Sequence, residues 1–157
     1  MVLSESHLDD PEVGRTVELL GGRAILRRSV RTRMEAHDLL IEGLPGGALK
    51  YLMTAWPILK VGEGLEKAFG ISRRTYQRRK EEPDKPLSPE QSGRAWKFAE
   101  ILGRAIELFG SRTEAEQWLE RPAMALDDRR PIDLLSTPAG VETVEDHLTR
   151  LEYGAYT

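Results

Sequence analysis

The sequence contains no cysteine, so it can form neither disulfide bonds nor thiolate metal sites. It also lacks an apolar run of the roughly 18 residues that a membrane-spanning helix needs. The opening stretch, MVLSESHLDD, is acidic and has no apolar segment of the kind found in secretory signals. These absences exclude disulfide-stabilised scaffolds and favour a cytoplasmic protein that makes no contact with a membrane.

Motifs for catalysis and for metal binding are missing as well. The three histidines, His7, His37 and His147, lie far apart in the chain and show no metal-ligand spacing. The Gly-Gly pairs at 21–22 and 46–47 follow no expected strand, and neither GxGxxG nor GK[ST] occurs. We therefore expect no catalytic residues, no metal site and no cofactor, and we interpret these residues as turns or surface positions.

Residues typical of strands are few, and strict alternation of apolar and polar residues is rare, whereas helix signals are frequent. Helices are expected over residues 13–20, 32–42, 45–56, 64–69, 72–82, 88–109, 111–121 and 138–151, with a helical turn at 131–135. Because the connections between them are short, the sequence predicts a compact all-α protein of about eight helices, divided into subdomains.

The clearest helix start lies after a proline-rich linker. Ser88 is a good N-cap, Pro89 stands at the first helical position, and Gln91 is placed to complete a capping box. Ser111 and Glu114 repeat the same spacing. We therefore expect two helices that begin at these serines, each with a reciprocal pair of capping hydrogen bonds.

The net charge of −3 hides an uneven distribution along the chain. Residues 23–60 carry seven bases and three acids, and residues 63–85 carry seven bases and five acids. Residues 111–157, in contrast, carry ten acids and five bases. A polyanion such as DNA would be attracted to the middle of the chain and repelled by its C-terminal third.

The stretch GISRRTYQRRK, residues 70–80, places five cationic side chains in eleven positions. Before it, Leu65 and Phe69 lie one helical turn apart, and Gly70 allows a sharp turn. Ile71 and Tyr76 are expected to face inward, which completes the apolar skeleton of a helix-turn-helix. Two alternatives remain open: a solvated basic helix, and a degenerate helix-turn-helix that only dimerises.

If Tyr76 is buried, the polar side chains of the second helix project outward. Arginine bonds guanine and glutamine bonds adenine in the major groove, and lysine or arginine later in the helix is better placed for phosphates. The predicted DNA-contact residues are Arg73, Arg74, Thr75, Gln77, Arg78, Arg79 and Lys80.

The last expected helix has a narrow apolar stripe with acidic residues around it, and the chain then ends in Tyr-Gly-Ala-Tyr-Thr. Chain ends usually fray and carry polar residues, so Tyr153 and Tyr156 indicate a tail that is buried somewhere. Either both rings fold back on the protein's own core, or they anchor an interface, for which tyrosine is well suited.

Several of these segments carry a family resemblance. The segments are the helix opening LSPEQSGR, the Phe-Gly at 109–110, the Trp-Leu at 118–119, the RPIDLL at 130–135 and the ending VEDHLTRLEYGAY. Together they closely resemble the Xre-type antitoxins of bacterial RES–Xre toxin–antitoxin systems. The resemblance covers about residues 35–157, and more loosely reaches back to residues 19–22. Glu66 and Tyr76 depart from the usual pattern of the family's helix-turn-helix, in which a small residue occupies the first position and an aliphatic residue the second.

Residues 1–22 form an N-terminal segment, which the sequence leaves open between ordered and flexible. The resemblance implies a helix-turn-helix region over residues 23–86 that dimerises and binds operator DNA. It implies a toxin-binding domain over residues 87–157. RES toxins are similar to ADP-ribosyltransferases and deplete or use NAD, and the antitoxin's C-terminal end blocks their NAD pocket. The toxin-binding residues implied for this chain are Leu151, Glu152, Tyr153, Gly154, Ala155, Tyr156 and Thr157.

Three functional hypotheses follow. The first is a cytoplasmic bacterial antitoxin that forms a homodimer, neutralises a RES toxin and represses its own operon. The second is a free-standing helix-turn-helix regulator whose C-terminal domain senses a ligand or only dimerises. The third is an interaction module without a DNA role. For the first, we expect Glu152 or the terminal carboxylate to meet positive groups in an anion-binding pocket of the toxin.

Overall fold

The computed structural model describes residues 9–60 and 63–154. Within these ranges the protein consists of nine α-helices and three short 3-10 helices and has no strand, so the all-α prediction is confirmed. In chain order the elements are α1 (Pro11–Leu19), α2 (Gly22–Leu26), α3 (Arg33–Glu42), α4 (Gly46–Ala55), η2 (Pro57–Lys60), α5 (Gly64–Phe69), α6 (Arg73–Lys80), α7 (Pro89–Phe109), α8 (Arg112–Glu120), η3 (Met124–Leu126), η4 (Pro131–Leu134) and α9 (Pro138–Gly154). None of the helices in the described ranges is long and apolar enough to cross a membrane.

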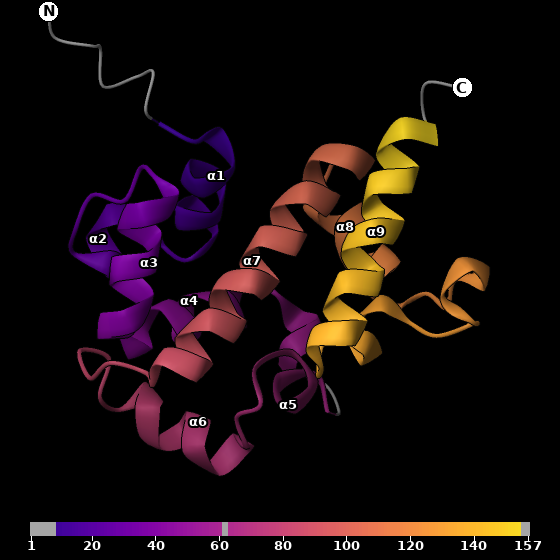
Figure 1. Cartoon of the computed structure of the whole chain (residues 1–157). Coiled ribbons are helices and arrows are strands. Elements are labelled where there is room, and N and C mark those ends of the chain that lie inside the picture. The colour runs from indigo at the N-terminus through magenta and orange to yellow at the C-terminus, as the bar shows by residue number, and fades with distance from the viewer. Residues whose placement is uncertain (1–8, 61–62, 155–157) are drawn as a thin grey trace, which may run out of the picture.

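Helix α7 is the spine of the molecule, as Figure 1 shows, and its predicted start is confirmed. The Ser88 side chain accepts from the backbone N–H of Gln91, and the Gln91 side chain accepts from the backbone N–H of Ser88. At Ser111 only half of the expected box forms, because Ser111 accepts from the N–H of Glu114 at 3.1 Å but the described residues show no return bond. Helix α8 therefore begins where predicted, with one capping bond instead of two.

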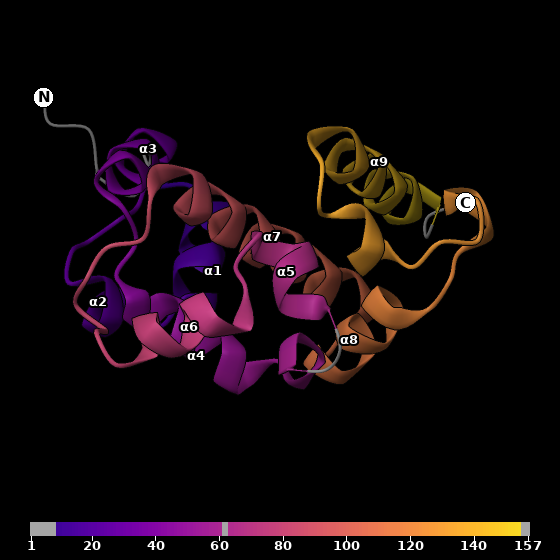
Figure 2. The same ribbon diagram turned by 90° about the horizontal axis from the view of Figure 1, so that it is seen from below.

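Helices α1, α3, α5, α8 and α9 pack directly around α7 (Figures 1 and 2). Helix α1 lies against its second half, where Arg15 contacts Gly103 and Glu107, while α2 and α4 join this group through α1 and through each other, and α6 packs beside α4. Helix α1, which falls in the segment whose order the sequence left open, buries Val13, Val17 and Leu19 in the core. The described part of that segment is thus a structural element of the fold.

Helix α2 is the α-helix in the described ranges that the sequence pattern did not predict. The two glycines at its start were interpreted as the end of the preceding helix. Gly21 does end α1 in the left-handed conformation with φ of +106°, but Gly22 begins a further five-residue helix. Leu26 of this helix is buried, so the additional turn closes the core next to α4.

The linker between α6 and α7 is fastened to the start of α4. The N–H of Leu87 donates to the carbonyl of Leu44 at 2.8 Å, and the N–H of Gly46 donates to the carbonyl of Lys85 at 3.0 Å. The buried Ser92 hydroxyl accepts from the N–H of Leu44 at 2.8 Å. These bonds fix the position of the segment that follows α6 relative to the start of α4.

A second set of contacts joins α5 to the C-terminal half. Asp133 in η4 accepts from Lys67 Nζ in α5 at 2.7 Å and receives two bonds from the Arg130 guanidinium, each of 2.8 Å. The hydrogen bond from Arg130, with that from Lys67, holds the pKa of the Asp133 carboxyl below its usual value. The RPIDLL segment therefore connects α5, the helix before the basic helix α6, to the C-terminal half of the molecule.

Candidate functional site

The turn between α5 and α6 has the predicted helix-turn-helix skeleton. Leu65, Phe69 and Ile71 are buried, and the Phe69 ring packs edge-on against the Phe98 ring with centroids 5.1 Å apart. Gly70 adopts the left-handed conformation with φ of +68° and caps α5. A Cβ at Gly70 would lie 2.1 Å from Nη1 of Arg94, a residue on α7 that donates to the carbonyl of Lys67 at 2.8 Å. The turn is thus closed by glycine and tied to the spine.

Helix α6 contains no fully buried residue and lies at the edge of the fold. Its N-cap is Ser72, whose hydroxyl accepts from the N–H of Thr75 at 3.1 Å, so Thr75 contributes to capping. Tyr76 is half-buried against the core, and this burial raises the pKa of its phenol. The inward-facing position predicted for Tyr76 is therefore occupied, but the ring keeps one edge in solvent.

The donors of α6 fall into two groups. Arg73 donates to the carbonyl of Lys60 at 2.8 Å, and Arg79 donates to the carbonyl of Pro86 at 3.2 Å. These two arginines, which we expected to contact DNA, hold the ends of α6 to neighbouring loops. The side chains that are exposed and make no hydrogen bond or ion pair within the described chain are Arg74, Gln77, Arg78 and Lys80.

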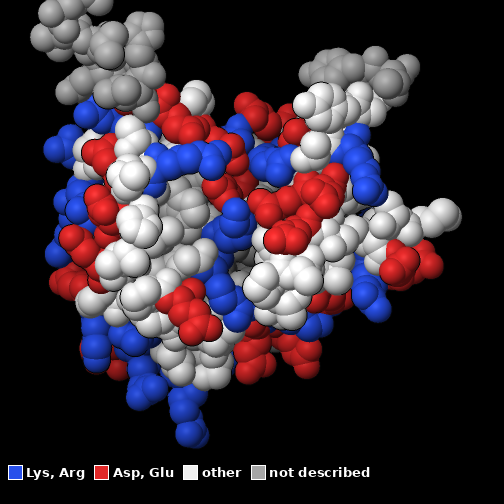
Figure 3. All heavy atoms as spheres, in the orientation of Figure 1, with Lys and Arg blue, Asp and Glu red and all other residues white. Residues whose placement is uncertain are grey.

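Cations from two other elements extend this surface. Lys50 of α4 and Lys60 of η2 line a hollow of about 430 Å³ together with Arg73, Gln77 and Lys80. In Figure 3, lysine and arginine side chains project from the lower edge of the molecule, where Figure 1 places α6. Lys50 and Lys60 were not predicted to belong to this basic surface, because they converge on α6 only through the fold.

The departure at Glu66 is accommodated by the orientation of α5. Glu66 is exposed, and Gly64 and Ala68 are the small buried residues of that helix. The carboxylate therefore points outward and does not separate α5 from its neighbours. Arg94, in contrast, is partly buried, and loss of hydration lowers the pKa of its guanidinium although the charge of Glu90 acts in the opposite direction.

At the other end of the molecule, α9 is fastened to α7 and α8. Val144 and Leu148 are completely buried, and the His147 ring stacks on the Trp118 ring with centroids 6.4 Å and planes 14° apart. Burial lowers the pKa of the His147 imidazole, and the neighbouring Arg150 charge adds to this effect.

Polar bonds from α7 complete the attachment of α9. Lys97 Nζ contacts Glu145 at 3.2 Å, and Arg104 donates to Thr149 at 2.9 Å and to Glu152 at 3.2 Å. Burial alone would lower the pKa of Lys97, but the hydrogen bond from its ammonium to Glu100 and the charge of Glu145 outweigh it and raise the pKa.

The pairing of Glu152 changes one expectation. Glu152, one of the two carboxylates expected to meet positive groups in a partner's pocket, is paired with Arg104 of the same chain. The bond arises because Arg104 and Glu152 lie on facing sides of two packed helices. Glu152 therefore serves to position the end of α9.

The described part of the predicted tail does not fold back on the core. Leu151 is half-buried, whereas Gly154 is exposed and the Tyr153 ring is 73% exposed. The interpretation that both tyrosine rings return to the protein's own core is therefore wrong for Tyr153. Ala155, Tyr156 and Thr157 lie outside the described residues.

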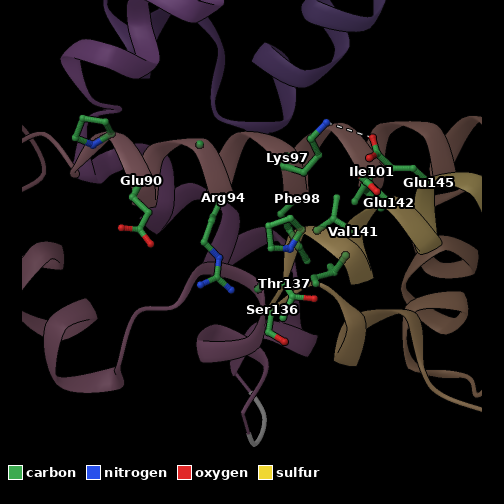
Figure 4. A pocket seen from close by; sticks show the side chains of 15 residues that line it. Glu90, Arg94, Lys97, Phe98, Ile101, Ser136, Thr137, Val141, Glu142 and Glu145 are labelled. Atoms are coloured by element: carbon green, nitrogen blue, oxygen red, sulfur yellow. Dashed lines mark hydrogen bonds and ion pairs between the residues drawn. The ribbon is translucent and has the colours of Figure 1, made fainter.

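Between α7 and the start of α9 lies a pocket of about 530 Å³. Figure 4 shows Arg94 and Glu90 at one side and Val141, Glu142 and the Lys97–Glu145 pair at the other. The floor is apolar, with Phe98 and Ile101, and charges of both signs stand at the rim. Across the ranges 9–60 and 63–154, no group of three or more acidic or histidine side chains is arranged to hold a metal ion.

Two family models match adjoining parts of the chain. Residues 62–100 match the antitoxin Xre-like helix-turn-helix domain, and residues 104–154 match the antitoxin Xre/MbcA/ParS C-terminal toxin-binding domain. The two models meet within α7, so the spine contributes to both. The family resemblance found in the sequence is thereby confirmed.

Curated proteins named "Antitoxin Xre" are similar to the chain. The protein of Photorhabdus laumondii is 32% identical over 117 residues, which is 74% of this chain and 77% of that protein. The protein of Yersinia enterocolitica is 35% identical over 92 residues, which is 58% of this chain and 62% of that protein. The chain thus aligns with less than two thirds of the Yersinia protein's length.

Proposed function

The chain belongs to the Xre family of antitoxins, and from this membership we propose that it is the antitoxin of a type II toxin–antitoxin pair whose toxin carries a RES domain. It acts in the bacterial cytoplasm, binds the toxin through its C-terminal domain and blocks the toxin's NAD pocket. The observation that carries the proposal is the position of Tyr153, exposed at the end of a helix that lies within the region matched by the toxin-binding model.

The end of α9 suits insertion into a partner. Arg104 and the buried Leu148 hold the helix up to its last turn, so the residues beyond Glu152 start from a rigid base. Tyr153, Gly154, Ala155, Tyr156 and Thr157 then form the inserted tail, with Leu151 and Glu152 as its base. The tyrosine rings supply apolar area with polar tips, which suits burial in a partner's pocket.

The basic surface of α6 serves the second part of the proposal. Arg74, Gln77 and Arg78 are exposed and free to reach base edges in the major groove, and Lys80 reaches phosphates. Helix-turn-helix proteins read two half-sites as dimers, so the region 23–86 both dimerises and binds the operator in this proposal. Residues 87–157 bind the toxin, and the protein represses its own operon.

Deletion of the tail tests the proposal. The chain is co-expressed with the RES-domain protein encoded beside it, and growth and cellular NAD are measured. Removal of residues 153–157 is expected to leave the helical content unchanged and to abolish protection, because the helix up to Glu152 keeps its contacts with α7. Full protection by the shortened chain would show that the tail does not block the toxin.

A matched pair of point variants separates the tail from general surface effects. Tyr153→Ala is expected to weaken protection, whereas Tyr51→Ala, which changes a tyrosine 38% exposed on α4, is expected to leave protection intact. If the wild-type chain binds its promoter but forms no complex with the neighbouring RES-domain protein, the chain is a free-standing regulator.

A further inference from the structure

The loop between α8 and α9 carries an unusual side chain at its tip. Met124 opens η3 and is 88% exposed, more than any other large hydrophobic residue in the described ranges. Scattered apolar side chains on a surface are ordinary, but such full exposure of a long thioether is notable when the loop that carries it is rigid. The exposure of Met124 on this loop therefore calls for a functional explanation.

The loop is rigid because its backbone bonds close on themselves. Ala123 and Arg129 form an antiparallel bridge, in which the N–H of Ala123 donates to the carbonyl of Arg129 at 3.1 Å. The carbonyl of Ala123 accepts from the N–H groups of Leu126 and Asp128, each at 2.9 Å. Leu126 is buried and anchors the loop beside α9, so the tip does not depend on Met124 for its shape.

The same loop contains two consecutive residues in a conformation that side chains avoid. Asp127 and Asp128 have φ of +55° and +59°, in the left-handed region that favours glycine or asparagine. Residues held in this way cluster at binding and switch sites. The loop therefore keeps a defined, tightly turned shape that presents Met124 outward.

The position of the loop indicates its partner. Residues 121–130, orange in Figures 1 and 2, project from α9 on the side turned away from α1 to α4. They lie within residues 104–154, the part matched by the toxin-binding model. The loop itself, RPAMALDDRR, carries three arginines and two aspartates, so its place within the toxin-binding region, and not its charge, selects the toxin as the occupant.

We propose that Met124 is a preformed apolar knob that enters a pocket on the toxin's surface, separate from the toxin's NAD pocket. This inference rests on the proposed function, because the occupant is the same toxin. Methionine is flexible and polarisable, so it fits an irregular apolar pocket, and the rigid loop keeps the entropy lost on binding small. The antitoxin then holds its partner at two points, the tail and the loop.

Methionine oxidation provides the test, because the protein contains its own control. Met34 on α3 is 70% exposed and lies outside the toxin-binding region. The full chain, alone and in complex with the neighbouring RES-domain protein, is treated with hydrogen peroxide, and sulfoxide at each methionine is followed by peptide mass spectrometry. Complex formation is expected to slow oxidation of Met124 about tenfold or more and to leave Met34 unchanged, as burial in an interface excludes the oxidant.

Point variants supply the second measurement. Met124→Ala is expected to weaken toxin affinity about 5- to 30-fold with no change in thermal stability or in promoter binding, since a buried interface anchor is lost but no core contact. Met34→Ala is the matched control and keeps wild-type affinity.

Each other outcome overturns a specific statement. Equal oxidation of Met124 in the free and bound chain, or wild-type affinity of Met124→Ala, removes the knob while the tail remains. If Met124 is protected from oxidation in the chain alone, and the protection increases with chain concentration, then a second copy of the chain covers Met124 instead of the toxin. If Met124 is protected from oxidation in the complex and the chain without residues 153–157 still neutralises the toxin, the tail does not block the pocket, whereas the loop contact is supported. If no complex forms with the wild-type chain, both proposals fail.

Discussion

Arg104 on α7 and Glu152 on α9 form an ion pair of 3.2 Å that joins residues 48 positions apart in the chain. The Arg104 side chain is 18% exposed, and the same guanidinium also bonds the Thr149 hydroxyl. This pair fixes the last turn of α9 immediately before the tail that we propose to enter the toxin.

Replacement of Arg104 by alanine is therefore expected to affect two properties. The free energy of unfolding should fall by about 1–2 kcal/mol, because two hydrogen bonds to a partly buried cation are lost. Toxin affinity should also weaken, since the tail then starts from a frayed helix end. Urea unfolding and a binding titration measure these effects. Arg23→Ala, which changes an exposed arginine without a partner in the described chain, is the control, and equal values for both variants would contradict the expectation.

The exposed arginines of α6 give the test of DNA binding. Arg74→Ala and Arg78→Ala are each expected to weaken binding to the promoter by about 1–3 kcal/mol if they contact bases. Lys80→Ala should weaken binding to all sequences alike and make it less dependent on salt, as a phosphate contact would. Fluorescence anisotropy at fixed ionic strength measures both.

Arg129→Ala serves as the control, because Arg129 is an exposed arginine in the acidic C-terminal third. An unchanged affinity in the Arg74→Ala, Arg78→Ala double variant would show that α6 does not read DNA. The region would then act in dimerisation alone.

Gly70 is the position where a small change should disturb the basic helix most. Alanine there must adopt a φ of +68°, and its Cβ would displace Nη1 of Arg94 from the turn. We expect Gly70→Ala to lower the free energy of unfolding by about 1–2 kcal/mol and to weaken promoter binding, because α6 is set in place by this turn.

Gly14→Ala is the matched control for Gly70→Ala. Gly14 lies in α1 with open space around it, so alanine should leave stability unchanged or raise it by up to about 1 kcal/mol. Thermal unfolding of the two variants compares them directly. A destabilisation of Gly14→Ala as large as that of Gly70→Ala would show that the loss is not specific to the turn.

His147 predicts a pH dependence of stability. Burial against Trp118 lowers its pKa in the folded state below the unfolded value of about 6.5, so the unfolded chain binds more protons in that range. The contribution of neutral His147 to the free energy of unfolding is therefore complete above about pH 6.5 and is lost as the pH falls below that value. Asp10 and Asp133 have lowered pKa values, so their contributions are lost only at more acidic pH.

Denaturant unfolding between pH 7.5 and 5 measures the effect of His147. His147→Phe should keep the stacked ring and flatten the pH dependence in this range. If the variant and the wild-type chain lose stability equally over this range, the imidazole is not responsible.

Local signals predicted much of the fold. The serine–proline start of α7, the glycine that closes the α5–α6 turn and the threonine–proline start of α9 are set by residues within one helical turn, and all three are where the sequence placed them. The double glycine before α2 shows the limit of such signals. A glycine in the left-handed conformation ends one helix, but whether the next residue begins another depends on a core that the local sequence does not describe.

The parts of the site that were missed depend on distant contacts. Lys50 and Lys60 join the basic surface because α4 and η2 pack beside α6, and nothing near them in the chain indicates it. Lys97 and Arg104 offered a signal, since they stand seven residues apart on one face of α7 and both bond α9. The pairing of Glu152 was not predicted, because its partner Arg104 lies 48 positions away in the chain.

The shared spine also limits how this protein could exchange parts with its relatives during evolution. Because α7 belongs to both halves, a recombination point inside it must preserve helical phase. Each inserted or deleted residue turns everything beyond it by about 100° and shifts it by about 1.5 Å. A chimera with a foreign toxin specificity should therefore fold only when its junction keeps the residue count of α7, whatever the similarity of the two sequences.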